Sequence, residues 1–265
     1  MSSNSSVQLI RNATVVLHYA GKKFLIDPML ADKGAYAGFP GTINSHLRNP
    51  LEALPVNPAS LYDVDAIIVT HLHADHWDQV AIQTLPKNKP VFAQNEADAT
   101  VIRAAGFQQV RSFANGGSFE GVSFFGTECQ HGSDEAYSVT WLAEFLGQAS
   151  GLLFKHPAEK TVYMIGDSIW IPAIEATLKE HTPDVVLINA GFATLEKYGA
   201  IIMGKEDFYR VHQIVPAAKL VAIHMEALNH CLLSRRELHE YVNEMGIADK
   251  VVIPRDGDII KFAEI

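Results

Sequence analysis

The chain has 265 residues, of which 48% are hydrophobic and 19% charged, a composition typical of a globular protein with a sizeable buried core. Its formal net charge is −9, and no basic stripe is present that could neutralise many phosphates, so we expect no nucleic-acid partner. No apolar run approaches the roughly 18 residues that a membrane span needs, and the N-terminal MSSNSSVQ is polar without basic residues. We therefore expect a cytoplasmic protein.

The N-terminal part of the sequence predicts a hairpin, a long irregular segment and a buried strand. Residues 13–27 contain two β-branched runs joined by a turn at Gly21. Residues 28–58 are rich in Gly, Pro and Asn and are too long for a routine connection. The apolar run DAIIVT at 65–70 is typical of a strand covered on both faces, and a short helical pattern follows at 78–85.

Strand and helix signals then alternate to the end of the chain. We expect strands at 91–94, 107–113, 121–130, 161–168, 184–191, 219–226, 250–254 and 258–260, and helices at 97–105, 172–181, 206–215 and 234–245. The last helix is predicted by a capping box formed by Ser234 and Glu237. The pattern indicates one α/β domain over residues 1–265, with two sheets packed face to face and helices outside.

Four metal-binding side chains follow the strand at 65–70 directly, in the segment HLHADHWD. They are His71, His73, Asp75 and His76. The loop at the carboxyl end of a strand is where α/β folds gather ligands, and imidazole with carboxylate suits zinc, manganese or iron. The spacing i, i+2, i+4, i+5 fits a curled loop that presents ligands to two adjacent metals. A chance cluster is the alternative, and it is rare at this spacing.

The segment HLHADH matches the HxHxDH signature of the metallo-β-lactamase superfamily, and the chain resembles that family from Asp27 to His224. The later elements fall in the family's order: His131 in GTECQHG, Asp167 in YMIGDS and His224 in VAIHME. The resemblance implies an αβ/βα four-layer sandwich of two mixed sheets. It also implies that Asp27, in FLIDP, orients the motif loop.

The resemblance further implies a binuclear centre with Zn or Mn, or alternatively Fe. One metal is assigned to His71, His73 and His131 and the other to Asp75, His76 and His224, with Asp167 bridging them. A hydroxide between the metals is the expected nucleophile, because two cations lower the pKa of a bridging water. Asp75 is a catalytic candidate as well as a ligand, since its carboxylate can accept or return a proton.

The family's substrate-polarising group is not identified by a motif. Within MEALNH, the candidates are Glu226, Asn229 and His230, all close behind His224. The alternative is that this segment forms a capping or packing turn. We predict that His230 contributes to catalysis if one of the three does.

Among the branches of the family, the chain looks most like compact metal-dependent hydrolases related to ascorbate-6-phosphate lactonase and the N-acylphosphatidylethanolamine phospholipase D group. The likeness lies in ATVVLHYAGKKFLIDP and THLHADHWD. We expect hydrolysis of an ester, lactone or phosphodiester bond in a small molecule, including an anionic one, because bound cations outweigh the global charge locally. The alternatives are a diiron redox protein and a non-catalytic metal-binding member.

The segment at 28–58 could fold over the site as a lid and supply Arg48 or His46 to an anionic substrate. The competing interpretation is a homo-oligomer contact or a surface loop. Cys129 and Cys231 are too few for a disulfide scaffold, and each lies beside a histidine. They are expected to be buried free thiols, or else to lie near the metals. The remaining histidines have no motif around them and are expected to be structural or exposed: His18, His156, His181, His212 and His239.

Overall fold

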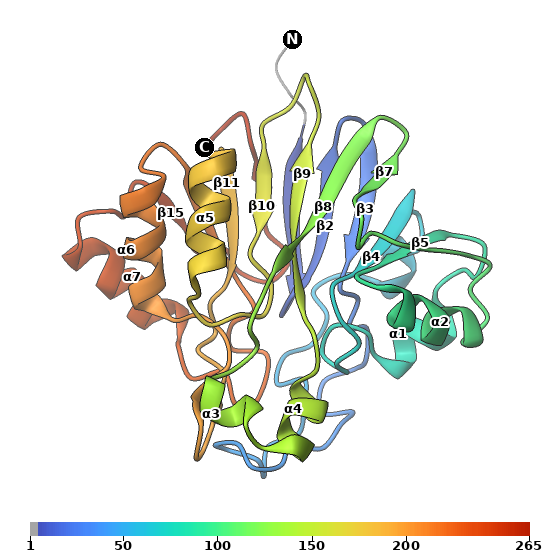
Figure 1. Ribbon diagram of the computed structural model, residues 1–265, viewed down its shortest axis with the longest axis horizontal. Helices are drawn as coiled ribbons and strands as arrows, with labels where there is room; N and C mark the ends of the chain where they lie inside the picture. Colours follow the sequence, from blue (N-terminus) through green and yellow to red (C-terminus); the bar gives the residue numbers. More distant parts are fainter. Residues whose placement is uncertain (1–4) are drawn as a thin grey trace.

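Two seven-stranded mixed sheets form the centre of the molecule in the computed structural model, which describes residues 5–265 (Figure 1). The first four residues of the polar N-terminal segment lie outside the described residues. The first sheet has the order β16-β1-β2-β3-β4-β5-β6. Its strands are β1 Ser6–Arg11, β2 Thr14–Tyr19, β3 Lys22–Ile26, β4 Ala66–Val69, β5 Pro90–Ala93, β6 Gln109–Ser112 and β16 Ile259–Lys261.

The second sheet has the order β15-β14-β11-β10-β9-β8-β7. Its strands are β7 Gly117–Phe119, β8 Val122–Glu128, β9 Ser150–Lys155, β10 Val162–Met164, β11 Val185–Asn189, β14 Lys219–Ile223 and β15 Val251–Val252. A separate two-stranded hairpin pairs β12 Thr194–Leu195 with β13 Gly199–Ala200. The helical segments are η1 Pro58–Leu61, α1 Gln79–Thr84, α2 Glu96–Ala104, α3 Asp134–Tyr137, α4 Thr140–Leu146, α5 Pro172–His181, α6 Lys205–Ile214 and α7 Arg235–Glu244.

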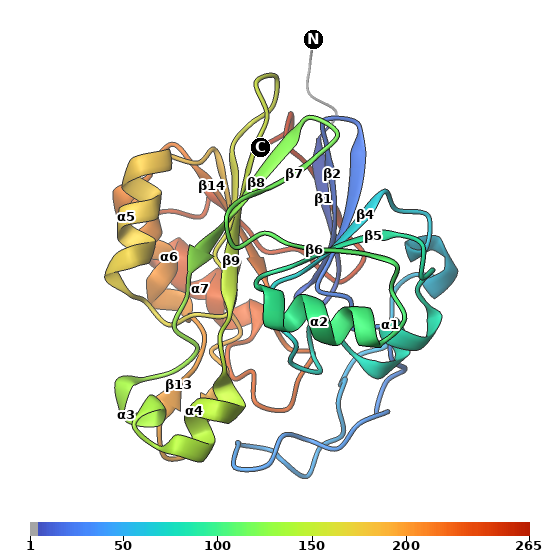
Figure 2. The ribbon, with the colours of Figure 1, turned by 45° about the vertical axis from the view of Figure 1, so that its right-hand side comes forward.

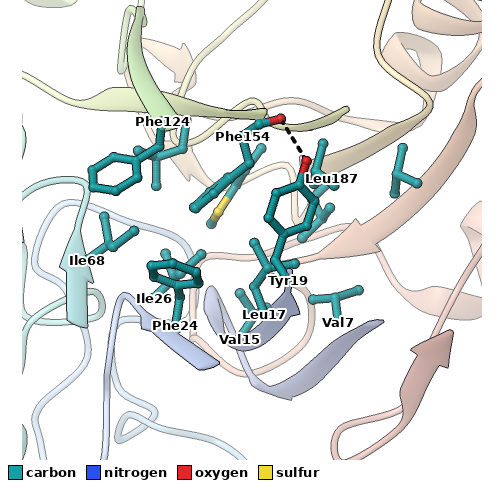
Figure 3. Close-up of a cluster of buried hydrophobic side chains, with 14 of the residues drawn as sticks. Val7, Val15, Leu17, Tyr19, Phe24, Ile26, Ile68, Phe124, Phe154 and Leu187 are labelled. Atoms are coloured by element: carbon teal, nitrogen blue, oxygen red, sulfur yellow. Dashed lines mark hydrogen bonds between the residues drawn. The ribbon is translucent and has the colours of Figure 1, made fainter. Parts of the chain in front are cut away.

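The inner faces of the two sheets pack against each other and exclude water. Phe24 of the first sheet and Phe124 and Phe154 of the second belong to one buried cluster, with ring centroids 5.7–6.3 Å apart (Figure 3). The Tyr19 hydroxyl is buried among these rings and donates a hydrogen bond to the carbonyl of Lys160 at 2.7 Å. These aromatic contacts hold the two sheets in a fixed position relative to each other.

Helices cover the outer face of each sheet, as the sequence predicts. Helices α1 and α2 pack on the first sheet, and α5, α6 and α7 pack on the second (Figures 1 and 2). The layers are therefore helix, sheet, sheet and helix, which confirms the predicted four-layer sandwich. No helix in the part of the chain that the structure describes is long and apolar enough to cross a membrane.

Eight elements were not predicted from the sequence: β1, η1, β7, α3, α4, β9, β12 and β13. The apolar run of β9 is short, and α3 has only four residues. Helix α4 begins at Thr140, and the side chain of Val139 before it caps no backbone N–H, so the usual start signal is missing. Helices α3 and α4 lie at the lower end of the molecule in Figures 1 and 2, below both sheets.

The topology brings the carboxyl ends of several strands to this same end. Strands β3 to β6 are parallel in the first sheet, and β10, β11 and β14 are parallel in the second. Strand β8 has the same direction as β10, because both are antiparallel to β9. The loops that follow β4, β8, β10 and β14 therefore meet at one edge of the sandwich.

The segment at 28–57 is an ordered loop that crosses this edge. Its regular pairing is limited to two bridges, Tyr36 with Asn49 and Thr42 with Leu195. Buried Arg11 holds its base by donating to the carbonyls of Met29 and Ala31, both at 2.9 Å. The loop is therefore fixed at both the sheet and the β12–β13 hairpin.

Candidate metal centre

The seven side chains predicted as ligands converge at the edge where these strands end. Their candidate ligand atoms form two groups, each with all atoms within 4.8 Å of one another. The first group is His71, His73 and His131, and the second is Asp75, His76, Asp167 and His224. All are buried except His73, which is half-buried.

One oxygen of Asp167 lies at the centre of the cluster. Its Oδ2 atom is surrounded by the Nε2 atoms of His76 at 3.2 Å, His224 at 3.6 Å, His131 at 3.7 Å and His71 at 3.9 Å. Most of these distances exceed those of a good hydrogen bond. The Asp167 carboxylate thus faces imidazole nitrogens of both groups.

Two inward-facing nitrogens make no hydrogen bond with the described residues, although carboxylate oxygens lie 3.3–3.9 Å from them. Buried His71 Nε2 and His224 Nε2 accept or donate no hydrogen bond within residues 5–265. Buried polar atoms without a partner are rare in folded proteins and call for an explanation such as a bound ion. Imidazole and carboxylate around such atoms are a donor set that fits divalent cations.

The outer nitrogen of each histidine is held by a partner outside the cluster. The contacts are His71 Nδ1 with Thr70 Oγ1 at 3.2 Å, His73 Nε2 with the Phe145 carbonyl at 2.8 Å, His76 Nδ1 with Asp27 Oδ2 at 2.8 Å, His131 Nδ1 with the Ile201 carbonyl at 2.9 Å, and His224 Nδ1 with Cys231 Sγ at 3.6 Å. A carbonyl or carboxylate oxygen only accepts, so the proton lies on the outer nitrogen of His73, His76 and His131. The inner nitrogen can then offer its lone pair to a metal, in His76 after it loses the proton that it shares with Asp167.

Asp27 positions the motif loop through three hydrogen bonds. Its carboxylate accepts from the Thr70 backbone N–H at 2.8 Å, the Thr70 hydroxyl at 2.7 Å and His76 Nδ1 at 2.8 Å. Asp27 is fully buried and has a φ of 48°, so the chain turns sharply at the end of β3. The structure places Asp27 where the resemblance implies.

Burial and neighbouring charges set the protonation of the cluster. Burial lowers the pKa of His71 well below its usual value and that of His131 to about 4, which leaves both neutral. Burial opposes the charge of Asp75 and Asp167, but His76 and His224 beside them hold both carboxyl pKa values well below normal. His71 and His131 are therefore neutral, whereas the neighbouring carboxylates, against the effect of burial, raise the pKa of His76 to about 10 and that of His224 well above its usual value. These two imidazoles would each release a proton when a metal binds.

A pocket of about 130 Å³ opens beside the cluster. Most of its lining is apolar, and its polar side chains are the cluster residues together with Thr42 and His230: Phe39, Pro40, Thr42, His73, Ala74, Asp75, His131, Phe145, Leu146, Asp167, Leu195, Ile201 and His230. None of the described residues in this lining is a lysine or an arginine. The lining therefore offers no side-chain cation to an anionic group.

The structure separates the three candidates behind His224. Glu226 accepts from the backbone N–H of Arg235 at 2.9 Å and from the Arg235 guanidinium. It therefore stabilises the turn between β14 and α7. Asn229 anchors the 28–57 loop. His230 alone lines the pocket, where its ring meets the edge of Phe39 with centroids 4.8 Å apart.

The loop reaches the pocket with different residues from those that the sequence suggested. Phe39, Pro40 and Thr42 form part of the wall, whereas Arg48 donates to the carbonyls of Gly34 at 2.7 Å and Ala35 at 2.9 Å. Neither Arg48 nor His46 lines the pocket. The Arg48 guanidinium is instead held by its own loop, so the hypothesis that it binds an anionic substrate has no support here.

Sequence reasoning missed most of the outer partners. Phe145 and Ile201 act through backbone carbonyls, which carry no sequence signal. Cys231 is a free thiol in contact with His224, so one of the two cysteines does lie near the cluster. Cys129 donates to the Ile165 carbonyl at 3.1 Å.

Comparison with known proteins agrees with this geometry. The family profile described as "Beta-lactamase superfamily domain" matches residues 22–225. The UPF0173 protein YddR of Bacillus subtilis is 46% identical over 258 residues, covering 97% of this chain and 100% of that protein. The crystal structure of isothiocyanate hydrolase from Delia radicum gut bacteria is 48% identical, with a TM-score of 0.94 over 96% of this chain and 98% of that one. The crystal structure of a possible metal-dependent hydrolase from Veillonella parvula is 38% identical, with a TM-score of 0.96, and the match covers 98% of this chain and 100% of that one. The chain therefore belongs to the beta-lactamase superfamily and, within it, to the UPF0173 family of metal-dependent hydrolases.

Proposed function

We propose that the protein is a two-metal hydrolase of small, weakly charged electrophiles, with isothiocyanates as the first substrate class to test. The observation that carries the metal part is the position of Asp167 Oδ2, within 3.9 Å of the Nε2 atoms of four histidines from both ligand groups. The apolar pocket beside it supports the substrate part.

In this proposal His71, His73 and His131 hold one metal, and Asp75, His76 and His224 hold the other. Asp167 serves both, which agrees with its place between the two groups. When bound, two divalent cations such as Zn²⁺ or Mn²⁺, or alternatively iron, would make a hydroxide available near neutral pH and stabilise negative charge on the substrate.

Two residues of the chain are proposed to act on the substrate directly. The Asp75 carboxylate lines the pocket and lies 3.3 Å from His224 Nε2, so it can receive or return a proton beside the reacting carbon. Burial lowers the pKa of His230 to about 4, which keeps it neutral. A neutral His230 on the pocket wall can donate an N–H to the atom that gains charge.

Isothiocyanate hydrolysis fits the apolar lining of the pocket, and its only co-substrate is water. Water adds to the central carbon of R–N=C=S, a C–O bond forms, and the nitrogen takes a proton. In the resulting thiocarbamic acid, R–NH–C(=O)–SH, the S–H proton moves to nitrogen as the C–N bond breaks, which yields the amine R–NH₂ and carbonyl sulfide. The 48% identical isothiocyanate hydrolase supports this choice.

The other bonds predicted from the sequence fit the pocket unequally. Ester and lactone carbonyls present a planar carbon of similar size, so they remain candidates. A phosphodiester, or a phosphate-bearing lactone as in the ascorbate-6-phosphate lactonase-like branch, is commonly held by arginine or lysine in addition to metals, and the described lining offers neither residue type. We therefore rank these substrates below isothiocyanates.

The test is initial-rate hydrolysis by metal-reconstituted protein of phenethyl isothiocyanate, a medium-ring lactone and bis(p-nitrophenyl) phosphate, in buffer without thiols. We expect turnover of the isothiocyanate, measured as amine and carbonyl sulfide, and its loss in Asp167→Asn. Asp63→Asn, a surface carboxylate paired with Lys23, is the matched control. Turnover confined to the phosphodiester would contradict the proposed substrate class. Absence of all three activities in protein that binds iron would favour diiron chemistry.

A further inference from the structure

The substrate pocket continues into a larger apolar groove on the surface. This groove has a volume of about 290 Å³ and is lined by Pro40, Gly41, Trp141, Leu142, Phe145, Leu195, Glu196, Lys197 and Tyr198. It shares Pro40, Phe145 and Leu195 with the pocket at the metal cluster. One wall therefore runs from the cluster to the outer end of the groove.

The inner pocket alone is small for a ligand site. Its volume of about 130 Å³ lies below the roughly 300–1,000 Å³ that is usual for such sites, whereas the pocket and the groove together fall within that range. The inner pocket can thus take the reacting group, and a longer substrate needs further space.

Helix α4 presents an aromatic face that the fold itself does not use. Leu142 and Leu146 point inward and are buried, while Trp141 and Phe145, four residues apart on the other face, are 64% and 50% exposed. Exposed aromatic side chains beside an active site mark a binding surface, because leaving them in water costs free energy.

Phe145 connects this face to the cluster. Its ring stacks on His73 with centroids 5.7 Å apart and planes at 26°, and its carbonyl accepts from His73 Nε2 at 2.8 Å. A group lying against Phe145 is therefore next to a metal-ligand side chain. The charged residues of the lining, Glu196 and Lys197, are exposed and lie in the turn between β12 and β13.

We propose that the groove between α4 and the β12–β13 turn binds the apolar side chain of the substrate, while the inner pocket holds its reacting group. Trp141 is then a specificity-determining residue that favours substrates with an aryl or long alkyl side chain. This inference rests on the proposed function for the reacting group, but the groove can also be tested without turnover.

The first measurement compares kcat/KM for phenethyl isothiocyanate with kcat/KM for methyl isothiocyanate. We expect the ratio to fall about tenfold in Trp141→Ala, because one apolar contact in a pocket contributes about that much discrimination. Phe125→Ala removes an exposed aromatic side chain of β8 that lines neither pocket and should keep the wild-type ratio. A ratio within twofold of the wild-type value in Trp141→Ala would overturn the assignment of Trp141.

The second measurement separates the groove from the reaction. Metal-loaded protein is titrated with 4-phenyl-1-butanol, and tryptophan fluorescence is recorded in the wild type and in Trp141→Ala. We expect a saturable change that Trp141→Ala abolishes, even if no isothiocyanate is hydrolysed, in which case only the proposed substrate class fails. No saturable change would overturn the inference. So would a wild-type dimer that Trp141→Asp dissociates, because the groove would then be covered by a second copy of the chain.

Discussion

Each histidine of the cluster depends on a residue that does not face the cluster. Asp27 and the carbonyls of Phe145 and Ile201 accept from the outer nitrogens of three histidines and so decide which nitrogen carries the proton. Thr70 and Cys231 contact the outer nitrogens of the other two, His71 and His224. Partners of this kind commonly change metal affinity by roughly 10–100-fold when they are removed. The chemistry of single residues can therefore be tested through metal binding.

Asp27→Asn should weaken metal binding by about 10–100-fold without unfolding the protein, because an amide cannot accept from His76 Nδ1 and both Thr70 donors as a carboxylate does. Competition with a chromophoric chelator measures the affinity. Asp65→Asn is the control, since Asp65 also accepts a backbone N–H, from Lys23, but lies away from the cluster. Wild-type affinity in Asp27→Asn would show that the outer partner does not matter.

His73→Ala should reduce the bound metal from two ions to one. It removes one of three side chains from the first group and leaves the second group of four intact. Metal content after desalting, measured by mass spectrometry, decides the outcome. His239→Ala, an exposed histidine of α7, should keep both ions. Two retained ions in His73→Ala would show that the grouping is wrong.

At the scale of elements, the 28–57 loop is held over the pocket by one buried side chain. Asn229 accepts from the Phe39 N–H at 3.1 Å and from Asn49 Nδ2 at 2.8 Å, and it donates to the Thr42 hydroxyl at 2.8 Å and the Ile43 carbonyl at 2.9 Å. It therefore joins the turn after β14 to the part of the loop that lines the pocket.

Asn229→Ala should lower the free energy of unfolding by about 2 kcal/mol, since it leaves buried donors and acceptors without partners. It should also raise KM, because Phe39 and Thr42 lose their support. Urea denaturation and steady-state kinetics measure the two effects. Asn88→Ala serves as the control, because Asn88 is exposed and accepts from Gln109 Nε2 through its backbone carbonyl, which the substitution keeps. A stable variant with an unchanged KM would mean that the loop is held by other contacts.

Elements with strong local signals could be predicted from the sequence, and those without them could not. The hairpin of β2 and β3 follows from alternating β-branched runs, and α7 follows from its Ser234 and Glu237 capping box, which the structure contains. Helix α4 lacks a side-chain cap and carries its apolar residues on two faces, so its pattern does not indicate one buried side. The groove that α4 forms could not be foreseen for the same reason.

The predicted ligand side chains could be found because their spacing is local or because each ends a recognisable strand. Their outer partners could not. Phe145 and Ile201 lie 72 and 70 residues from the histidines that they contact, and they act through backbone carbonyls. The lid hypothesis named Arg48 and His46, whereas the loop reaches the pocket through Phe39, Pro40 and Thr42, because loop conformation is set by distant contacts such as that with Asn229.

At the scale of the whole molecule, the cluster joins the two sheets at one edge. His76 follows β4 of the first sheet, and Asp167 and His224 follow β10 and β14 of the second. Metal ions bound by this cluster in the folded chain would therefore hold both halves together. Removal of the metals with a chelator should lower the melting temperature by several degrees, as measured by calorimetry, and re-addition should restore it. An unchanged melting temperature after verified metal removal would mean that the ions do not bridge the sheets.

The central claim is that two metals act together in hydrolysis at this edge. Its most direct test is a titration of metal-free protein with Mn²⁺ or Zn²⁺ while the hydrolysis rate of phenethyl isothiocyanate is recorded. The rate should rise until two equivalents are bound per chain and then level off, and Asp167→Asn should never reach the plateau. A full rate at one equivalent, or in verified metal-free protein, would contradict a two-metal mechanism.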